Sequence, residues 1–194
     1  MEPFEYFVVL SSLILGLGIA QLLTGVADIV SNLKNVKVGL AHSLAVFNVF
    51  VIHIQEWFYS YQYLYAVKTW KLPIVIFLLI YPILLFLLAR MLFPTGLRGH
   101  EKDLKEYYYD QWNWFFSVLL AIVVVSFLQN VMISGEEIAF QIPQFLLAGV
   151  IIIFLLFDIK NERAHNVFMI ALAVSWILWI IFDPYELAYT DSPF

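Results

Sequence analysis

The sequence predicts an all-α polytopic membrane protein, a six-transmembrane-helix bundle with short loops that forms one domain over residues 1–194. Hydrophobic residues make up 63% of the chain and charged residues only 13%, whereas soluble domains average about 45–50% apolar and about 25% charged residues. The mean hydropathy is +0.87. The apolar residues also gather in six continuous runs, each close to the roughly 20 residues that a helix needs to cross a bilayer core.

The six predicted spans are separated by polar segments that contain proline, glycine or charged residues. They cover residues 6–28, 39–61, 72–93, 112–133, 141–159 and 165–182. Asn161 is expected to cap the last span, and Asp183-Pro184 is expected to end it. Because the runs are continuous, they argue against a β-barrel, whose strands alternate apolar and polar residues. They also lack the broad polar stripe of a soluble helix.

The lysines and arginines predict which side of the membrane each loop occupies. With six spans, one side carries eight of the ten basic residues: Lys34, Lys37, Arg90, Arg98, Lys102, Lys105, Lys160 and Arg163. The other side carries only Lys68 and Lys71. Loops rich in lysine and arginine stay in the cytoplasm. We therefore expect a cell membrane protein, most naturally of a bacterial inner membrane, with both termini outside the cytoplasm.

The longest loop, residues 94–111, is then a cytoplasmic loop at the membrane interface. In it, Glu101 stands four residues before Lys105, a spacing that favours a short helix. A structured loop that leads into the fourth span explains the same residues.

Small residues form two ridges along the first span. The first ridge contains Ser12, Gly16, Ala20, Thr24 and Asp28. The second contains Ser11, Gly18, Gln21 and Gly25. Small residues let helices approach closely in lipid, so we expect both faces to pack against protein. Packing within the chain, a homo-oligomer or membrane-protein partner, and a narrow pore wall all stay open.

The second span holds the densest set of polar side chains: His42, Asn48, His53, Gln55 and Glu56. At 100° per residue, His42, His53 and Glu56 fall within an arc of about 60°. Such a stripe is expected to face the bundle interior or a water-filled cavity. His53 and Glu56 are i,i+3 neighbours that can relay a proton or bind a cation. Alternatively, Glu56 reaches the headgroup region and His53 makes a packing hydrogen bond.

Other spans carry polar residues at the same expected depth as His53 and Glu56. They are Ser126, Gln129 and Asn130 in the fourth span, and Gln141 and Gln144 at the start of the fifth. Together with Gln21 of the first span, they predict a polar pocket that opens toward the outer side.

Several function classes lack support in this sequence. The chain has no cysteine and a net charge of −5, so thiolate metal sites are excluded and nucleic-acid binding is not expected. No phosphate loop, serine elbow or zinc-helix motif is present. Haem ligation would need two histidines at one depth, and no spacing motif supports it. We expect no metal, no cofactor and no enzyme activity, with the lipid bilayer as the one certain partner.

Three functions stay open. The first is a small proton or cation channel or transporter, with the first two spans as its path and His53 and Glu56 as carriers. The second is a non-catalytic sensor or partner subunit that binds a ligand, a lipid or another membrane protein. The third is a membrane-embedded lipid or quinone enzyme with His53 and Glu56 as an acid–base pair.

Overall fold

The computed structural model describes residues 2–94 and 102–182, and almost all of them are helical. The elements are α1 (Pro3–Ser31), β1 (Val36–Lys37), α2 (Leu40–Tyr59), the 3₁₀ turn η1 (Ser60–Gln62), α3 (Tyr63–Ala66), α4 (Leu72–Met91), β2 (Lys102–Asp103), α5 (Leu104–Gln129), the π-helical turn η2 (Asn130–Ser134), the 3₁₀ turn η3 (Ile138–Gln141), α6 (Ile142–Leu156) and α7 (Glu162–Phe182). Within these residues, β1 and β2 form a two-residue parallel bridge. The fold is therefore all-α, as predicted.

Five helices in the described residues are long and apolar enough to cross a membrane. They cover Pro3–Ser31, Leu72–Met91, Leu104–Ser134, Ile138–Leu156 and Glu162–Phe182. Helix α2 lies within the remaining expected span, 39–61, and is also 20 residues long. It is not among the five, because its histidine, amide and carboxyl side chains are spread along the helix and interrupt its apolar stretch.

The ends of two helices show how local residues set the boundaries. Asn161 accepts hydrogen bonds through Oδ1 from the backbone N–H of Arg163 at 2.8 Å and of Ala164 at 3.3 Å, which confirms the predicted cap. Helix α5 begins at Leu104 rather than at the expected residue 112. The reason is Asp103, whose Oδ1 accepts from the backbone N–H of Glu106 at 3.0 Å.

Some expected features lie outside the described residues. They are Asp183-Pro184, Arg98 and Glu101.

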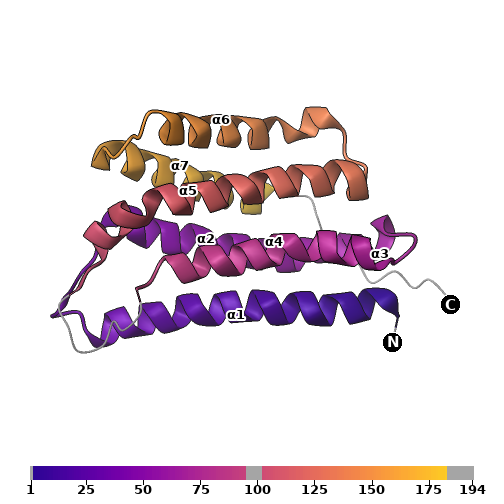
Figure 1. Ribbon diagram of the computed structural model, residues 1–194, viewed down its shortest axis with the longest axis horizontal. Coiled ribbons are helices and arrows are strands. Elements are labelled where there is room, and N and C mark those ends of the chain that lie inside the picture. The colour runs from indigo at the N-terminus through magenta and orange to yellow at the C-terminus, as the bar shows by residue number, and fades with distance from the viewer. Residues whose placement is uncertain (1, 95–101, 183–194) are drawn as a thin grey trace.

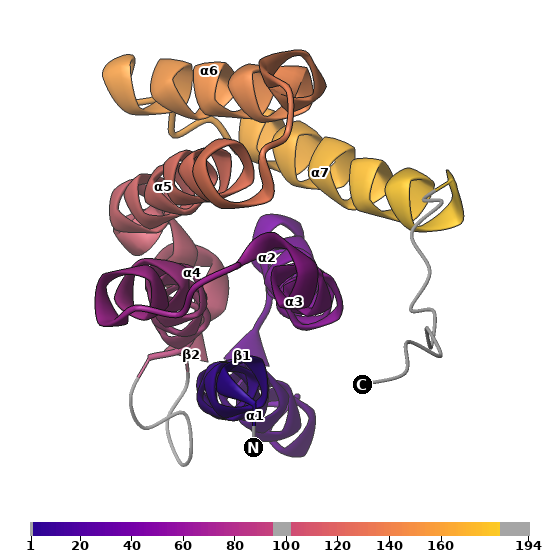
Figure 2. The same cartoon turned by 90° about the vertical axis from the view of Figure 1, so that its right-hand side faces the viewer.

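The six long helices run alternately up and down the bundle, so α1 starts and α7 ends at the same end of the molecule (Figure 1). Helix α1 lies at one edge, against α4 and α2, while α6 lies at the opposite edge, against α5 (Figure 2). Helix α2 packs on α7, α4, α1 and α5. The one long helix that falls short of the apolar character of the other five is therefore also the one with the most helical neighbours, as expected for polar side chains in a membrane bundle.

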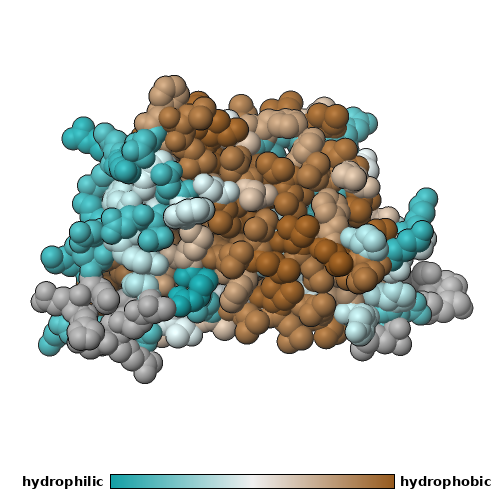
Figure 3. Space-filling view, in the orientation of Figure 1, coloured by the Kyte–Doolittle hydropathy of each residue, from teal (hydrophilic) through white to brown (hydrophobic). Residues whose placement is uncertain are grey.

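The surface has the character of a membrane bundle. A broad hydrophobic band covers the middle of the visible face, and hydrophilic residues gather at its two ends (Figure 3). Large apolar side chains such as Leu13, Leu17 and Ile181 are 61–65% exposed. Exposed apolar area on this scale is unusual in soluble proteins and normal for a surface that faces lipid.

The two small-residue ridges of α1 have different surroundings. In the second ridge, Ser11, Gly18 and Gly25 are buried, and a Cβ on Gly25 would come within 2.5 Å of the Phe93 ring. In the first ridge, Gly16, Ala20 and Thr24 are exposed, and Ser12 and Asp28 are half-buried.

No described atom lies within 4 Å of a Cβ built on Gly16. Within the chain, the second ridge is thus the one that packs on other helices.

Candidate functional site

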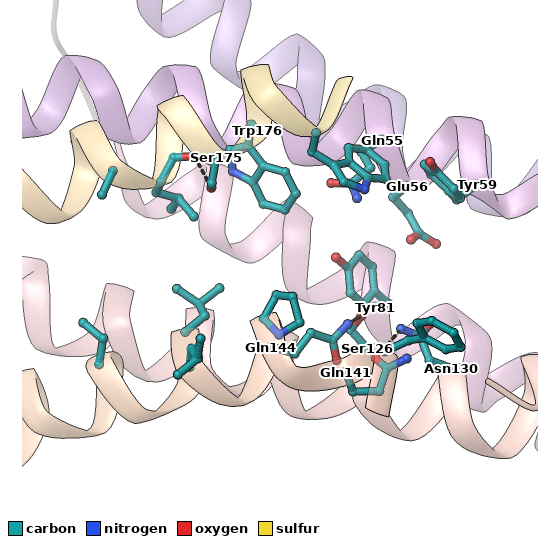
Figure 4. A pocket seen from close by; sticks show the side chains of 18 of the residues that line it. Gln55, Glu56, Tyr59, Tyr81, Ser126, Asn130, Gln141, Gln144, Ser175 and Trp176 are labelled. Carbon is teal, nitrogen blue, oxygen red and sulfur yellow. Dashed lines mark hydrogen bonds between the residues drawn. The ribbon is translucent and has the colours of Figure 1, made fainter. Parts of the chain in front are cut away.

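A cavity of about 1170 Å³ lies between α2 and α7 on one side and α5 and α6 on the other (Figure 4). Tyr81 of α4 and residues of η1, η2 and η3 complete its lining. It is far larger than the space between well-packed helices, which leaves few voids wider than a water molecule. Its volume falls just above the usual range for ligand pockets.

One face of α7 forms a wall along most of the length of that helix. The lining residues from this helix are Arg163, Ala164, Val167, Phe168, Ala171, Leu172, Ser175, Trp176 and Trp179. Their spacing of three and four is that of a single helical face. From Arg163 to Trp179 this face extends about 24 Å at 1.5 Å per residue, which is most of the roughly 30 Å thickness of a bilayer core.

The cavity is open along its side, between α6 and α7. Helix α6 packs mainly on α5 and α7 packs mainly on α2, so the two helices diverge from the turn that joins them (Figure 2). Leu146 on α6 and Val167 on α7 both line the cavity, yet they are 67% and 65% exposed. In a bilayer, this opening would face lipid.

The end of the cavity nearest the start of α1 is polar. Gln55, Glu56 and Tyr59 reach it from the last turns of α2, as Figure 4 shows. Ser126 and Asn130 face them from the end of α5 and from η2. The rest of the lining along α6 and α7 is mostly apolar, apart from Ser175 and the terminal Arg163.

Hydrogen bonds fix most of the amide groups at this polar end. Asn130 Nδ2 donates to Gln141 Oε1 at 3.0 Å, and Gln141 Nε2 donates to Glu136 Oε2 at 2.6 Å. Gln144 Nε2 donates to Ser126 Oγ at 3.1 Å. The turn from α5 into α6 is therefore tied together by side chains, with their amide N–H groups used as donors.

Gln129 joins α4 and α5 beside the same end. Its Nε2 donates to the backbone carbonyl of Phe77 at 2.7 Å, and its Oε1 accepts a long hydrogen bond of 3.4 Å from the Tyr63 hydroxyl. Gln129 is buried, as a membrane amide with satisfied partners should be.

Glu56 differs from its polar neighbours because no described residue donates a hydrogen bond to its carboxyl group or forms an ion pair with it. In Figure 4 its side chain extends from α2 into the space between the two walls. Three buried atoms of the lining also lack partners: Gln55 Oε1, Gln144 Oε1 and Trp176 Nε1. The cavity thus offers unsatisfied polar groups to an occupant.

Three residues that the sequence assigns to the pocket lie elsewhere. His53 Nδ1 bonds to the Val49 carbonyl at 2.7 Å, and its Nε2 points toward Gly18 of α1, away from the cavity lining. Asn48 Nδ2 donates to the Met169 carbonyl of α7 at 3.1 Å. Gln21 belongs to α1, which contributes no residue to the lining. The structure brings together Gln55, Glu56, Ser126, Gln129 and Asn130.

The remaining described histidines serve as links between elements. His165 uses both ring nitrogens, toward the Tyr108 hydroxyl at 2.9 Å and the Ile159 carbonyl at 2.7 Å. His42 Nε2 bonds to the Leu92 carbonyl at 2.8 Å. Within residues 2–94 and 102–182, no group of three or more His, Asp or Glu side chains is arranged to hold a metal ion.

The α7 wall is the part of the site that sequence reasoning missed. Its signal is a row of smaller side chains, Ala164, Ala171 and Ser175, on one face of an otherwise bulky helix. Tyr59, Tyr81 and Trp176 also line the cavity and were not among the predicted pocket residues.

Comparison of this chain with known protein families, with curated proteins and with solved structures finds no match in any of the three.

Proposed function

We propose that all six long helices cross the cell membrane and that both termini lie outside the cytoplasm. The alternating directions of the helices, the comparable lengths of α2 and α4, and the eight-to-two split of basic residues support this topology. The polar end of the cavity then lies toward the outer side. A bacterial inner membrane fits this arrangement.

Cysteine labelling tests the topology directly, because the native chain has no cysteine. Lys68→Cys and Lys160→Cys place one exposed thiol at each end of the bundle. A membrane-impermeant maleimide should label the first variant in intact cells and the second only after permeabilisation. Labelling with the opposite pattern, or equal labelling of both thiols in intact cells, contradicts the topology.

Within this bundle, we propose that the protein binds an amphipathic molecule, and that it acts as a lipid or ligand sensor, carrier or partner subunit. One observation carries the proposal: a cavity with a polar end runs for about 24 Å along a mostly apolar wall of α7 and opens sideways between α6 and α7. A polar head at Glu56 and an apolar chain along α7 would satisfy both parts. The open side would admit such a molecule from the bilayer.

A blocked cavity tests this function. Ala171→Trp places a large side chain in the cavity, whereas Ile170→Trp places it on the adjacent, 44% exposed position that does not line the cavity. Native mass spectrometry should show a bound amphiphile with wild type and Ile170→Trp and a loss of at least tenfold in occupancy with Ala171→Trp. Equal occupancy in all three proteins would refute the proposal.

Proton or cation passage is the second candidate, and the unpaired carboxylate of Glu56 in the cavity favours it. Intramembrane carboxylates commonly mark proton or ion pathways. The apolar lining toward Arg163 supports this function less well, because a cation must leave through that half of the cavity.

Flux measurements test whether the protein passes protons or cations. In proteoliposomes, Glu56→Gln should abolish proton or potassium flux if the path exists, while Glu137→Gln, outside the cavity lining, should keep it. Wild-type flux no greater than that of empty liposomes excludes it. A lipid or quinone enzyme is supported least, because His53 faces α1 while Glu56 faces the cavity.

A further inference from the structure

We propose that the ligand carries a protonated amine head group, which binds beside Glu56, and a long apolar chain, which lies along α6 and α7. This inference rests on the proposed binding of an amphipathic molecule and specifies its chemical class. The cavity selects for it through charge, through the kind of hydrogen-bonding atom left free, and through the distribution of its apolar side chains.

The ionisable side chains at the polar end are acids. Glu56 and Glu136 both line it, and no described lysine or arginine does. The one basic residue of the described lining is Arg163, in the first turn of α7, at the opposite end of the cavity. A cationic head therefore fits next to Glu56, whereas a carboxylate or phosphate head would meet two acidic groups in a region of low dielectric.

The free hydrogen-bonding atoms at this end are mainly acceptors. The amide nitrogens of Asn130, Gln141 and Gln144 each already donate one hydrogen bond, to Gln141, Glu136 and Ser126 respectively. The oxygens Gln55 Oε1 and Gln144 Oε1 have no donor, and neither has the carboxylate of Glu56. An ammonium group supplies three donors and no acceptor, which matches this set.

One unpartnered atom of the lining is a donor instead of an acceptor. Trp176 Nε1 is a buried donor without a partner, about one turn of α7 from Trp179. It leaves a place for one acceptor, such as a hydroxyl oxygen, on the α7 wall. The aromatic rings of Tyr59 and Tyr81 border the polar end beside Glu56 (Figure 4). Such rings attract cations at their faces.

The distribution of apolar side chains favours a long apolar chain. Beyond the polar end, its walls are apolar side chains of α6 and α7, including Leu147, Val150, Phe168 and Leu172. The acidic groups lie at one end of these walls and Arg163 lies at the other, so a molecule with one cationic head and one apolar tail fits in one direction. The opening beside Leu146 and Val167 provides a route from the bilayer that keeps the tail in an apolar environment.

Three probes of equal chain length test the head group: a long-chain primary amine, the matching alcohol and the matching fatty acid, each brominated at mid-chain. Bromine quenches tryptophan fluorescence on contact, so binding to full-length protein in phosphatidylcholine nanodiscs is followed as quenching, with Trp176→Phe identifying the signal of Trp176. We expect saturable quenching by the amine at a concentration at least tenfold below that for the alcohol, and weaker binding still for the acid.

Charge variants assign the preference to Glu56. Glu56→Gln should reduce amine binding at least tenfold and leave alcohol binding unchanged, which also shows that the variant is folded. Glu56→Asp, which restores the charge, should regain most of the preference for the amine. Glu137→Gln, an exposed acid at the same end but outside the lining, should behave as wild type.

The outcomes separate this inference from the proposed function. Equal binding of amine and alcohol, or unchanged amine binding in Glu56→Gln, overturns the cationic head group but leaves amphiphile binding intact. Quenching that never saturates with any probe means contact with bulk lipid only. That result overturns both proposals.

Discussion

At the scale of single residues, Glu56 and the polar side chains of α5 and η2 border one cavity, whereas His53, one turn before Glu56 on α2, faces α1. Ser126, Gln129, Asn130 and Glu56 were expected at one depth, and they border one cavity. His53 was expected beside Glu56 and instead faces α1. The helical period fixes the angle between two side chains of one helix. Which helix occupies each side depends on the packing of the whole bundle, and no residue of α2 encodes that.

Gly18 gives a prediction at this scale. A Cβ at Gly18 would overlap the His53 imidazole, which is buried and held by its bond to Val49. Gly18→Ala should therefore destabilise the protein by about 1–3 kcal/mol, as overpacking does. The control is Gly149→Ala, because no described atom lies within 4 Å of a Cβ there, and it should be neutral or stabilising by up to about 1 kcal/mol. Unfolding midpoints in detergent measure both, and equal effects would show that the contact between α1 and α2 is absent.

At the scale of helices, hydropathy predicts the spans well because lipid imposes a length and an apolar surface on each of them. Five of the six expected spans correspond to helices that are apolar enough to cross a membrane. The start of α5 was missed, since the Asp103 cap adds turns that carry charged residues. The α7 wall was missed because a helix that lines a partly apolar cavity has nearly the same composition as one that faces lipid.

The contact between α5 and α7 gives the second prediction. Tyr108 donates to His165 Nδ1, because His165 Nε2–H is taken by the Ile159 carbonyl. Both rings are buried, so Tyr108→Phe leaves a buried acceptor unsatisfied, at a cost of about 1–3 kcal/mol. Lys105 and Glu162 join the same helices at 2.8 Å but are 47% and 54% exposed, and Lys105→Ala should cost under about 1 kcal/mol. If thermal unfolding shows the reverse order, the exposed ion pair is the stronger link.

At the scale of the whole molecule, composition predicts a membrane bundle, and the arrangement of the helices adds an asymmetry that composition does not contain. Helices α1, α2, α4 and α5 form a packed body, whereas α6 and α7 spread apart on one side of it. The cavity follows from this spread. The packing preferences of helix pairs cannot be read from one sequence. The sequence therefore predicted a polar pocket but not the apolar part of the cavity along α6 and α7.

The exposed ridge of α1 gives a prediction at this scale. Gly16, Ala20 and Thr24 form a small-residue surface at the edge of the bundle, where a second membrane helix can approach closely. If the protein forms a homo-oligomer through this ridge, Gly16→Leu should convert it to monomer. The control is Leu17→Phe, because Leu17 is the adjacent residue, is 61% exposed and lies outside the ridge. This variant should keep the oligomer. Native mass spectrometry measures the mass of each complex, and an oligomer unchanged by Gly16→Leu excludes the ridge as the interface.

The central claim is that the space between α6 and α7 holds an apolar chain whose head lies at Glu56. Photolabelling in a bilayer tests it most directly, with a long-chain amine that carries a diazirine at mid-chain. Peptide mapping should place the label on the cavity-facing residues of α6 and α7, including Leu147 and Ala171, with an excess of unlabelled amine removing it. Label spread evenly over lipid-facing residues such as Leu13 and Ile181, and not reduced by the competitor, would contradict the claim.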